Sequence, residues 1–286
     1  MTFGSFIDPD PSVIDVADLA ERMGCPIRGG YRAMDHARHL LGRNRLFDAI
    51  WERSCAVPLQ YEDQCSTEYY FDLVKTLRDF NGEFEHVVEV GAFMGGSSSI
   101  FAGCMERLDF TLDLVDIHPG RLRFSYERVR RLYPEAAARI RLFHGDLAHY
   151  VRAVMMVEKP RSTIVHHDGS HEFKQVVKDM ASLYYVRDQL FAVIAQDTHL
   201  RGSIEFTLFV DMALYAVFGT ELKFAPIGAV YAEGDPICDP NRYEGHYFVP
   251  GRHEGVVIPM SCNAFHYPHP RQSIDEFLPA ALDRAA

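Results

Sequence analysis

Five short apolar segments recur between residues 86 and 195, and a helical pattern separates each from the next. Strands that alternate with helices form parallel βαβ units, and continuous apolar runs are typical of strands covered on both faces. The pattern therefore predicts a doubly wound, mostly parallel α/β sheet. The five predicted strands are His86–Val90, Thr111–Ile117, Ile140–His144, Thr163–His167 and Phe191–Ala195.

Apolar residues at helical spacing mark the helices between these strands. A helix beginning at Thr67 is predicted to end at Asn81-Gly82, directly before the first strand. Two further stripes predict core-facing helices. The spaced apolar positions are Tyr70, Val74, Leu77 and Phe80; Ile100, Cys104 and Leu108; and Phe173, Val177, Met180 and Tyr184.

The two ends of the chain complete the predicted architecture. Residues 1–65 are interpreted as an N-terminal helical cap, 66–260 as the main domain and 261–286 as a C-terminal extension with a weak helix at Ile274–Leu282. Ser203–Phe218 predicts a helix that is buried nearly all round. The segments Leu222–Ala232 and His246–Val257 predict an antiparallel closing hairpin, which brings the sheet to seven strands.

Composition narrows the class of partner. The chain has 286 residues with 29 Lys and Arg against 40 Asp and Glu, a net charge of −11. This balance disfavours nucleic acid and anionic membranes, so we expect a small-molecule partner. The N-terminus lacks the pattern of a signal peptide, and no apolar run is long enough to span a membrane. These two features predict a cytoplasmic protein. A homo-oligomer is compatible with the sequence. The six scattered cysteines suggest neither a zinc site nor a disulfide framework.

The clearest chemical signal follows the first strand. That strand contains Glu89, turns through Gly91 and Gly95, and leads into a helix that opens with three serines. Glycines let the backbone approach a ligand, and a helix N-terminus offers free amide donors. A plain turn with serine caps would explain the serines but not the acid, so the segment predicts a ligand-binding turn.

The glycine spacing decides which ligand this turn holds. A dinucleotide turn has the pattern Gly-x-Gly-x-x-Gly, whereas this chain has Glu89-x-Gly91-x-x-x-Gly95. The segment resembles motif I of the class I S-adenosylmethionine-dependent methyltransferases and so implies a Rossmann-like fold. The resemblance places Glu89 by the methionine part of the cofactor, Asp116 on the ribose hydroxyls and Asp146 by the adenine amine. The predicted cofactor-binding residues are Glu89, Gly91, Phe93, Gly95, Ser97, Ser98, Asp116, His118, Asp146 and Asp168.

Polar side chains also follow the fourth and fifth strands. Asp168 comes after the fourth strand, and Gln196 and Asp197 come after the fifth. The carboxyl ends of adjacent parallel strands lie side by side, so these residues can converge, and three oxygen ligands suit a hard cation such as Mg²⁺. Asp168 also has an alternative role as a helix N-cap.

With His171, this pattern resembles the metal-dependent O-methyltransferases of natural-product biosynthesis, in particular the rhamnosyl and cephamycin-pathway group and the macrolide-sugar group. That group has Glu or Asp where this chain has Gln196. The neutral amide can still offer its carbonyl oxygen, but it brings no charge, so cation affinity should be lower.

Methyl transfer to a hydroxyl requires a base, and histidine suits this role near pH 7. The resemblance implies that His171 is this base, and His199 and His167 are further candidates. The sequence thus predicts an O-methyltransferase that uses S-adenosylmethionine, with Mg²⁺ as a second expected ligand, and acts on a sugar or another secondary metabolite.

Four alternatives remain open at this stage. An N-methyltransferase would need no hydroxyl activation, and a non-catalytic cofactor-binding subunit would account for Gln196. An NAD-dependent oxidoreductase is disfavoured by the glycine spacing. A nucleic-acid methyltransferase is disfavoured by the net charge and by the absence of an Asn-Pro-Pro-Tyr-like tetrapeptide.

Overall fold

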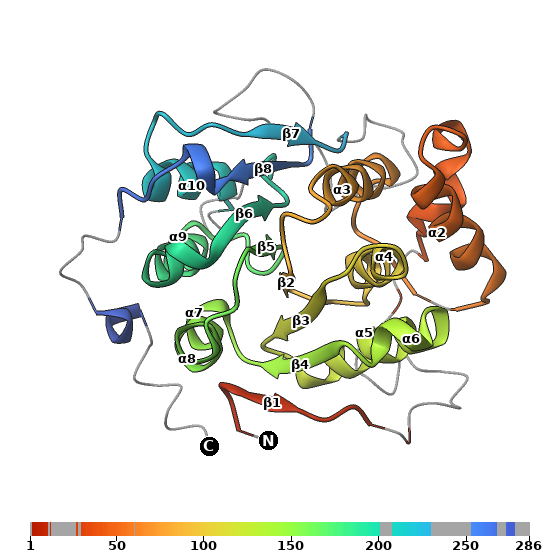
Figure 1. Cartoon of the computed structure of the whole chain (residues 1–286), viewed down its shortest axis with the longest axis horizontal. Coiled ribbons are helices and arrows are strands. Elements are labelled where there is room, and N and C mark those ends of the chain that lie inside the picture. Colours follow the sequence, from red (N-terminus) through yellow and green to blue (C-terminus); the bar gives the residue numbers. More distant parts are fainter. Residues whose placement is uncertain are drawn as a thin grey trace.

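Eight strands form one mixed sheet at the centre of the computed structural model (Figure 1). The structure describes residues 2–10, 12, 27, 30–59, 61–200, 208–229, 253–267 and 273–277. The spatial order of the strands is β1-β4-β3-β2-β5-β6-β8-β7. The strands are β1 (Ser5–Ile7), β2 (His86–Val90), β3 (Thr111–Asp116), β4 (Ile140–His144), β5 (Thr163–His167), β6 (Leu190–Ala195), β7 (Ala225–Ile227) and β8 (Gly255–Pro259).

The five central strands confirm the predicted parallel sheet. β4, β3, β2, β5 and β6 are parallel neighbours, while β1, β8 and β7 pair antiparallel at the two edges. The predicted limits of β2, β4 and β5 are correct at both ends, β3 ends one residue early and β6 begins one residue early. Ile117, predicted as the last residue of β3, is 53% exposed beyond the end of the strand.

The count of seven strands was wrong for the described residues, because β1 adds an eighth. β1 pairs with β4 in the register Ser5↔His144. A strand of three residues is too short to show an alternating pattern, so only its pairing with β4 reveals it. The division of the chain at residues 65 and 260 stays a prediction.

The closing strands confirm the predicted antiparallel hairpin topology with different limits. β7 pairs with β8 over Ala225–Ile227, and β8 pairs in turn with β6. Residues 230–252 lie outside the described part of the chain, so the predicted ends at Ala232 and His246 fall there. The strand β8 begins later than predicted, at Gly255.

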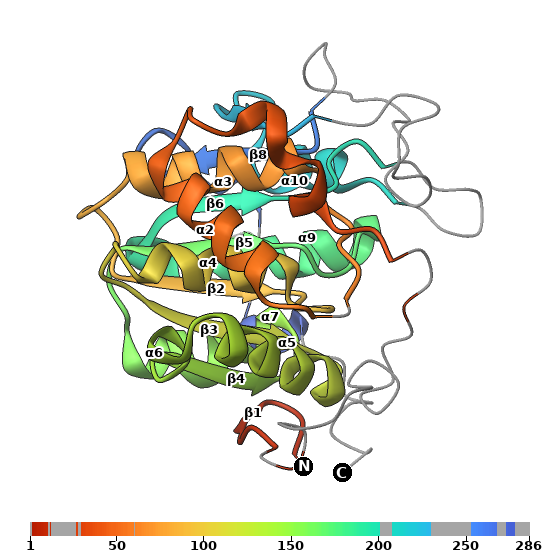
Figure 2. The ribbon, with the colours of Figure 1, turned by 90° about the vertical axis from the view of Figure 1, so that its right-hand side faces the viewer.

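Helices cover both faces of the sheet. Figures 1 and 2 show α2 to α6 on one face and α7 to α10 on the other. The helices are η2 (Ala33–Leu40), α2 (Arg45–Ala56), α3 (Thr67–Asp79), α4 (Gly96–Met105), α5 (Pro119–Leu132), α6 (Pro134–Ala137), α7 (Leu147–Tyr150), η3 (Val151–Met155), α8 (Met156–Glu158), α9 (Phe173–Ser182), η4 (Leu183–Gln189), α10 (Val210–Phe218), η5 (Met260–Cys262) and η6 (Ile274–Phe277).

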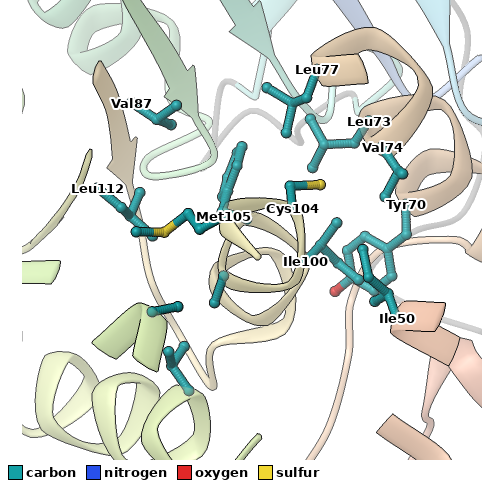
Figure 3. Packing of buried hydrophobic residues seen from close by; sticks show 14 of the residues in the cluster. Ile50, Tyr70, Leu73, Val74, Leu77, Val87, Ile100, Cys104, Met105 and Leu112 are labelled. Atoms are coloured by element: carbon teal, nitrogen blue, oxygen red, sulfur yellow. The ribbon is translucent and has the colours of Figure 1, made fainter. Parts of the chain in front are cut away.

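Two apolar clusters follow from this double coverage. Val87 and Leu112 belong to the cluster under α2 to α6, while their neighbours Val88 and Val115 belong to the opposite cluster. Side chains alternate across a strand, so a sheet covered on both faces requires continuous apolar strands. Figure 3 shows α4 at the centre of the first cluster, with Cys104 between α3 and the sheet.

The predicted helices agree with the structure in part. Tyr70, Val74 and Leu77 of α3 are buried as expected. On α9, Met180 is buried and the half-buried Phe173 and Val177 pack against the same cluster, as expected, while Val176 is buried in addition and Tyr184 lies beyond the end of the helix.

The last two predicted helices differ more from the structure. The described part of the Ser203–Phe218 helix begins at Val210, and it is not buried all round, because Met212 is 38% exposed. Of the predicted C-terminal helix, only the turn Ile274–Phe277 lies in the described residues.

Candidate active site

A cavity of about 320 Å³ lies where the strand order reverses. The strand β2 lies between β3 and β5, so the loops after β2 and β5 diverge and leave a crevice at their carboxyl ends. The described lining residues are Glu62, Asp63, Gln64, Cys65, Tyr70, Ala92, Phe93, Gly96, Ser97, Arg121, Asp168, Gly169, His171 and Asp197. The loops after β2, β5 and β6 and the segment before α3 therefore form one site.

The turn after β2 requires its glycines. Gly91 has φ +91°, and a Cβ at this position would lie 2.0 Å from the carbonyl oxygen of Asp168. Gly95 has φ +75° and lies against Ser125. Alanine at either position would combine an unfavourable left-handed backbone with a steric overlap. Gly91 thus allows the turn after β2 to pack against the loop after β5, and Gly95 allows it to pack against α5.

Glu89 holds the first turn of α4. Its carboxylate accepts hydrogen bonds from the hydroxyls of Ser97 and Ser98, the latter at 2.6 Å, and it is fully buried. Burial raises the pKa of Glu89 to about 8, although the two serine hydrogen bonds oppose the rise. Ser97 lines the cavity, whereas Glu89 and Ser98 lie behind its wall, and their predicted contacts with the cofactor stay predictions.

Asp116 connects the turn after β2 to the loop after β3. Its Oδ2 accepts a hydrogen bond from the amide of Ala92 at 3.0 Å, and its Oδ1 accepts one from the amide of His118 at 2.8 Å. Each carboxylate oxygen has a second lone pair, so both remain able to accept a hydroxyl. The structure thus places Asp116 at the predicted edge of the sheet, and its contact with ribose stays a prediction, as does a cofactor contact of the exposed His118.

Asp146 caps the short helix α7 and pairs with cations. It accepts hydrogen bonds from the amide and the ring of His149 and from Lys178 Nζ at 2.5 Å. Burial alone would raise the pKa of Asp146, but His149 and Lys178 lower it to about 2. Asp146 is not among the described residues that line the cavity, and its predicted role at the adenine stays a prediction.

Phe93 lies in the cavity wall, as predicted for a cofactor-binding residue. Its backbone has φ +40°, a conformation that is unusual for a bulky side chain. The Arg121 guanidinium lies 5.5 Å from the centre of its ring. The tight turn after β2 thus holds this aromatic side chain at the mouth of the site.

Asp168, His171 and Asp197 form one cluster in the same cavity. They offer ligand atoms that all lie within 4.8 Å of one another. His171 Nε2 lies 3.0 Å from Asp197 Oδ2 and 3.7 Å from Asp168 Oδ1. Within the described residues, neither His171 Nε2 nor Asp197 Oδ1 makes a hydrogen bond of good geometry although both atoms are buried. Buried polar atoms without such bonds are unusual, and carboxylate oxygens gathered in such a place fit a hard cation.

The charges in this cluster are strongly coupled. Burial raises the pKa of Asp168 to about 6; the charge of His171 opposes this rise and that of Asp197 adds to it. Burial alone would lower the pKa of His171, but Asp197 and Asp168 raise it to about 9. At neutral pH the imidazole is therefore protonated, and the carboxyl groups of Asp168 and Asp197 face it.

The backbone at Asp197 supports a specialised role. Asp197 has φ +56°, in the left-handed region that few residues other than glycine adopt. Such a conformation costs free energy and is found most often where a side chain must be aimed precisely. Here it follows β6 directly and brings the carboxylate to His171.

The positions of the three histidines distinguish which of them can act as the base. His171 lines the cavity, whereas His199 and His167 are buried and are not among the described lining residues. His167 Nε2, at the end of β5, lies 3.0 Å from Oδ2 of Asp179 in α9. The geometry thus favours His171, and a catalytic role of His199 stays a prediction.

The residues of segment 61–66 were not named individually as site candidates from the sequence. Asp63 is buried in the cavity wall, where it accepts a hydrogen bond from the Ala33 amide at 2.9 Å and pairs with Arg128 at 3.4 Å. The Arg128 guanidinium also lies 3.4 Å from the centre of the Tyr61 ring. No local sequence pattern predicts these contacts, because they join residues 30 or more positions apart in the sequence.

Removal of Arg128 should destabilise the fold. Arg128→Met would leave the Asp63 carboxylate buried without its cation, which typically costs about 3–5 kcal/mol. Urea unfolding followed by circular dichroism would measure the change. The matched control is Arg78→Met, whose partner Asp79 is exposed, and we expect a change of about 0.5 kcal/mol or less there. Equal losses in the two variants would show that the buried pair does not anchor this segment.

Comparison with known proteins finds a match for the central part of the chain. Residues 88–189 match the family model described as a methyltransferase domain. No curated protein sequence matches the chain.

Similar solved structures include three methyltransferases. The O-methyltransferase from Bacillus cereus in complex with SAH is 12% identical over 79% of this chain and 94% of that one, with a TM-score of 0.49. TrmK from M. capricolum in complex with S-adenosyl-homocysteine is 9% identical over 69% of this chain and 71% of that one, with a TM-score of 0.42. Precorrin-6y C5,15-methyltransferase from Geobacter metallireducens is 11% identical over 72% and 94%, with a TM-score of 0.37.

None of the described helices combines the length and the apolar character needed to cross a lipid bilayer.

Proposed function

We propose that this chain, an S-adenosylmethionine-dependent methyltransferase of class I, methylates a hydroxyl group of a small molecule such as a sugar or another secondary metabolite. The observation that carries the proposal is the cluster of Asp168, His171 and Asp197 beside the glycine turn. A hydroxyl is a poor nucleophile until its proton is removed, so a methyltransferase acting on oxygen needs a basic or cationic group at this place.

The cavity suits the charge of the cofactor. S-adenosylmethionine carries a sulfonium and an ammonium group, and Glu62, Asp63, Asp168 and Asp197 line the cavity. The first turn of α4 adds backbone amide donors, because its N-cap Gly95 provides no capping side chain. Acids for the cations and amides for a carboxylate are the groups that the methionine part of the cofactor requires.

The cluster fits a divalent cation held by Asp168 and Asp197, with His171 beside them. A bound Mg²⁺ or Mn²⁺ would lower the pKa of the acceptor hydroxyl and hold a second oxygen of the acceptor next to it. Carboxylate oxygens are acceptable ligands for either ion.

His171 is proposed as the general base. Its pKa of about 9 leaves it protonated while the two carboxylates are uncompensated, so it can accept a proton only when their charge is offset. The hydroxyl oxygen then bonds to the methyl carbon, the carbon–sulfur electron pair returns to sulfur, and the hydroxyl proton passes to His171. The products are the methyl ether and S-adenosylhomocysteine.

Two alternatives remain for comparison. A subunit without catalytic activity would have no reason to keep Asp168, His171 and Asp197 on one cavity wall, yet all three line it. An N-methyltransferase would not need a cation or a base. Cation dependence of turnover therefore separates methylation of oxygen from methylation of nitrogen.

Calorimetric titration tests the cofactor and the cation together. The purified protein is titrated with S-adenosylhomocysteine and with NAD, each in Mg²⁺ and in chelator. We expect S-adenosylhomocysteine to bind and NAD to give no heat. Activity towards a panel of hydroxylated acceptors is then measured, and activity that survives chelation together with Asp197→Ala would refute the role of the cation.

Two substitutions should separate cofactor binding from chemistry. Asp116→Ala should weaken S-adenosylhomocysteine binding by about 100-fold, since it removes both the ribose ligand and the support of the Ala92 amide. His171→Ala should leave that affinity within about threefold and lower kcat instead. Calorimetry and single-turnover kinetics measure the two effects, and an equal loss of affinity in both variants would contradict these roles.

A further inference from the structure

Gln196 lies between the proposed cation cluster and the segment before α3. It follows β6 directly, is buried, and its backbone amide donates to the His167 carbonyl at 3.0 Å. One end of its carboxamide lies 2.7 Å from Asp168 Oδ2 and 3.2 Å from Asp168 Oδ1. The other end lies 3.0 Å from Cys65 Sγ and, in a weaker contact, 3.4 Å from Glu254 Oε1.

The chemistry of its neighbours decides how the carboxamide is oriented. An ionised carboxylate only accepts hydrogen bonds, so the end that faces both oxygens of Asp168 must be the NH₂ group. The carbonyl then faces the Cys65 thiol, which can donate to it, and more distantly the Glu254 carboxyl, whose pKa burial raises well above its ordinary value so that it can carry a proton. The opposite orientation would set the carbonyl oxygen 2.7 Å from one carboxylate oxygen and 3.2 Å from the other, with no hydrogen to share between them.

We infer that Gln196 is a positioning residue that donates a hydrogen bond to Asp168, rather than a ligand of the cation. This inference rests on the proposed function, because the cation belongs to that proposal. Gln196 fixes the rotation of the Asp168 carboxylate and connects it to Cys65 in the cavity wall. The carboxylates of Asp168 and Asp197 then hold the cation with His171 beside them, and Gln196, which the sequence predicted as a ligand, instead orients the Asp168 carboxylate.

The inference also explains why a neutral residue occupies this position. A glutamate at 196 would place its carboxylate about as close to Asp168 as the amide is now, with no hydrogen to share between them. An amide has one donor and one acceptor end, which match the carboxylate on one side and the thiol on the other. Because Gln196 does not bind the cation, its lack of charge does not reduce the charge of the cation's ligands.

Side-chain NMR of the full-length ¹⁵N-labelled protein tests the hydrogen bond directly. Gln196→Leu identifies the pair of Gln196 NH₂ signals by their loss. We expect Asp168→Asn to shift this pair by more than Cys65→Ser does, because Cys65→Ser keeps a donor at the carbonyl end. A folded Asp168→Asn protein with an unchanged Gln196 pair would overturn the inference. If that variant does not fold, the Mn²⁺ affinity of Gln196→Glu decides between the two roles.

The affinity for Mn²⁺ alone gives the second readout. A positioning residue predicts that Gln196→Glu binds Mn²⁺ about tenfold more weakly at pH 7, since the donor to Asp168 is lost. A ligand predicts the opposite sign, because a carboxylate binds Mn²⁺ better than an amide. Tighter binding in Gln196→Glu would therefore overturn the inference. Failure of the unmodified protein to bind Mn²⁺ would refute the proposed cation instead, and the NMR experiment would still decide the role of Gln196.

Discussion

Gly91→Ala is expected to lower the free energy of unfolding by about 3 kcal/mol or more and to weaken S-adenosylhomocysteine binding by about 100-fold or more. The left-handed backbone at φ +91° accounts for about 1–2 kcal/mol of the loss. The larger effect comes from the new methyl group, which would meet the Asp168 carbonyl oxygen at 2.0 Å. The atoms that the methyl group would meet belong to the backbone of Asp168 and Gly169, which cannot rotate away. The loops after β2 and β5 would therefore have to separate, and the cavity lies between these loops.

Gly82→Ala is the matched control for this substitution. Gly82 has φ +83°, close to that of Gly91, but a Cβ there would have no atom within 4 Å. We expect a loss of about 1–2 kcal/mol without any change in ligand affinity. Urea unfolding and calorimetry compare the two variants. If Gly91→Ala loses no more stability than Gly82→Ala and binds normally, the close packing of the two loops is not what forms the site.

The affinity for Mn²⁺ is expected to rise about tenfold for each pH unit between pH 6.5 and 8.5. The pKa of His171 is raised to about 9, so the imidazole is protonated over this range. A cation that binds beside Asp168 and Asp197 must displace that proton, and loss of one proton gives a tenfold gain for each unit of pH. The gain ends above pH 9. Below about pH 6, Asp168 also takes up a proton, so the dependence becomes steeper.

Calorimetry at several pH values measures this slope in the protein and three variants. His171→Gln has no imidazole to deprotonate and should give a nearly flat profile. Asp197→Ala should abolish binding, whereas Asp188→Asn, an exposed acid away from the cavity, should behave like the unmodified protein. A flat profile in the unmodified protein, or an unchanged slope in His171→Gln, would show that His171 does not compete with the cation.

The sequence located most of the site because its residues follow strands. Glu89, Asp116, Asp168 and Asp197 each lie at or beside the carboxyl end of a predicted strand, and parallel strands bring those ends to one edge. Candidate residues at that edge could therefore be named before any coordinate was known. The separate roles of these residues could not be predicted in the same way. Asp168 faces the cavity, whereas Glu89 accepts hydrogen bonds from the hydroxyls of Ser97 and Ser98 behind the cavity wall.

Site residues that do not follow a parallel strand were not predicted from the sequence. Asp63 and Cys65 precede α3, and only the packing of α3 against α4 brings them over the cavity. The strand β1 is likewise defined only by its pairing with β4. The orientation of the Gln196 amide depends on Asp168 on one side and Cys65 on the other, and these partners are far apart in the sequence.

By itself the sequence determined the alternation of strands and helices, the glycine turn and the acids at the strand ends, because apolar periodicity and backbone preferences are local properties. The tertiary structure decided which of these side chains face the cavity, which segment closes it, and which protonation state His171 adopts. Those properties depend on distances between residues remote in sequence, since burial and electrostatic attraction are fixed only when the chain is packed.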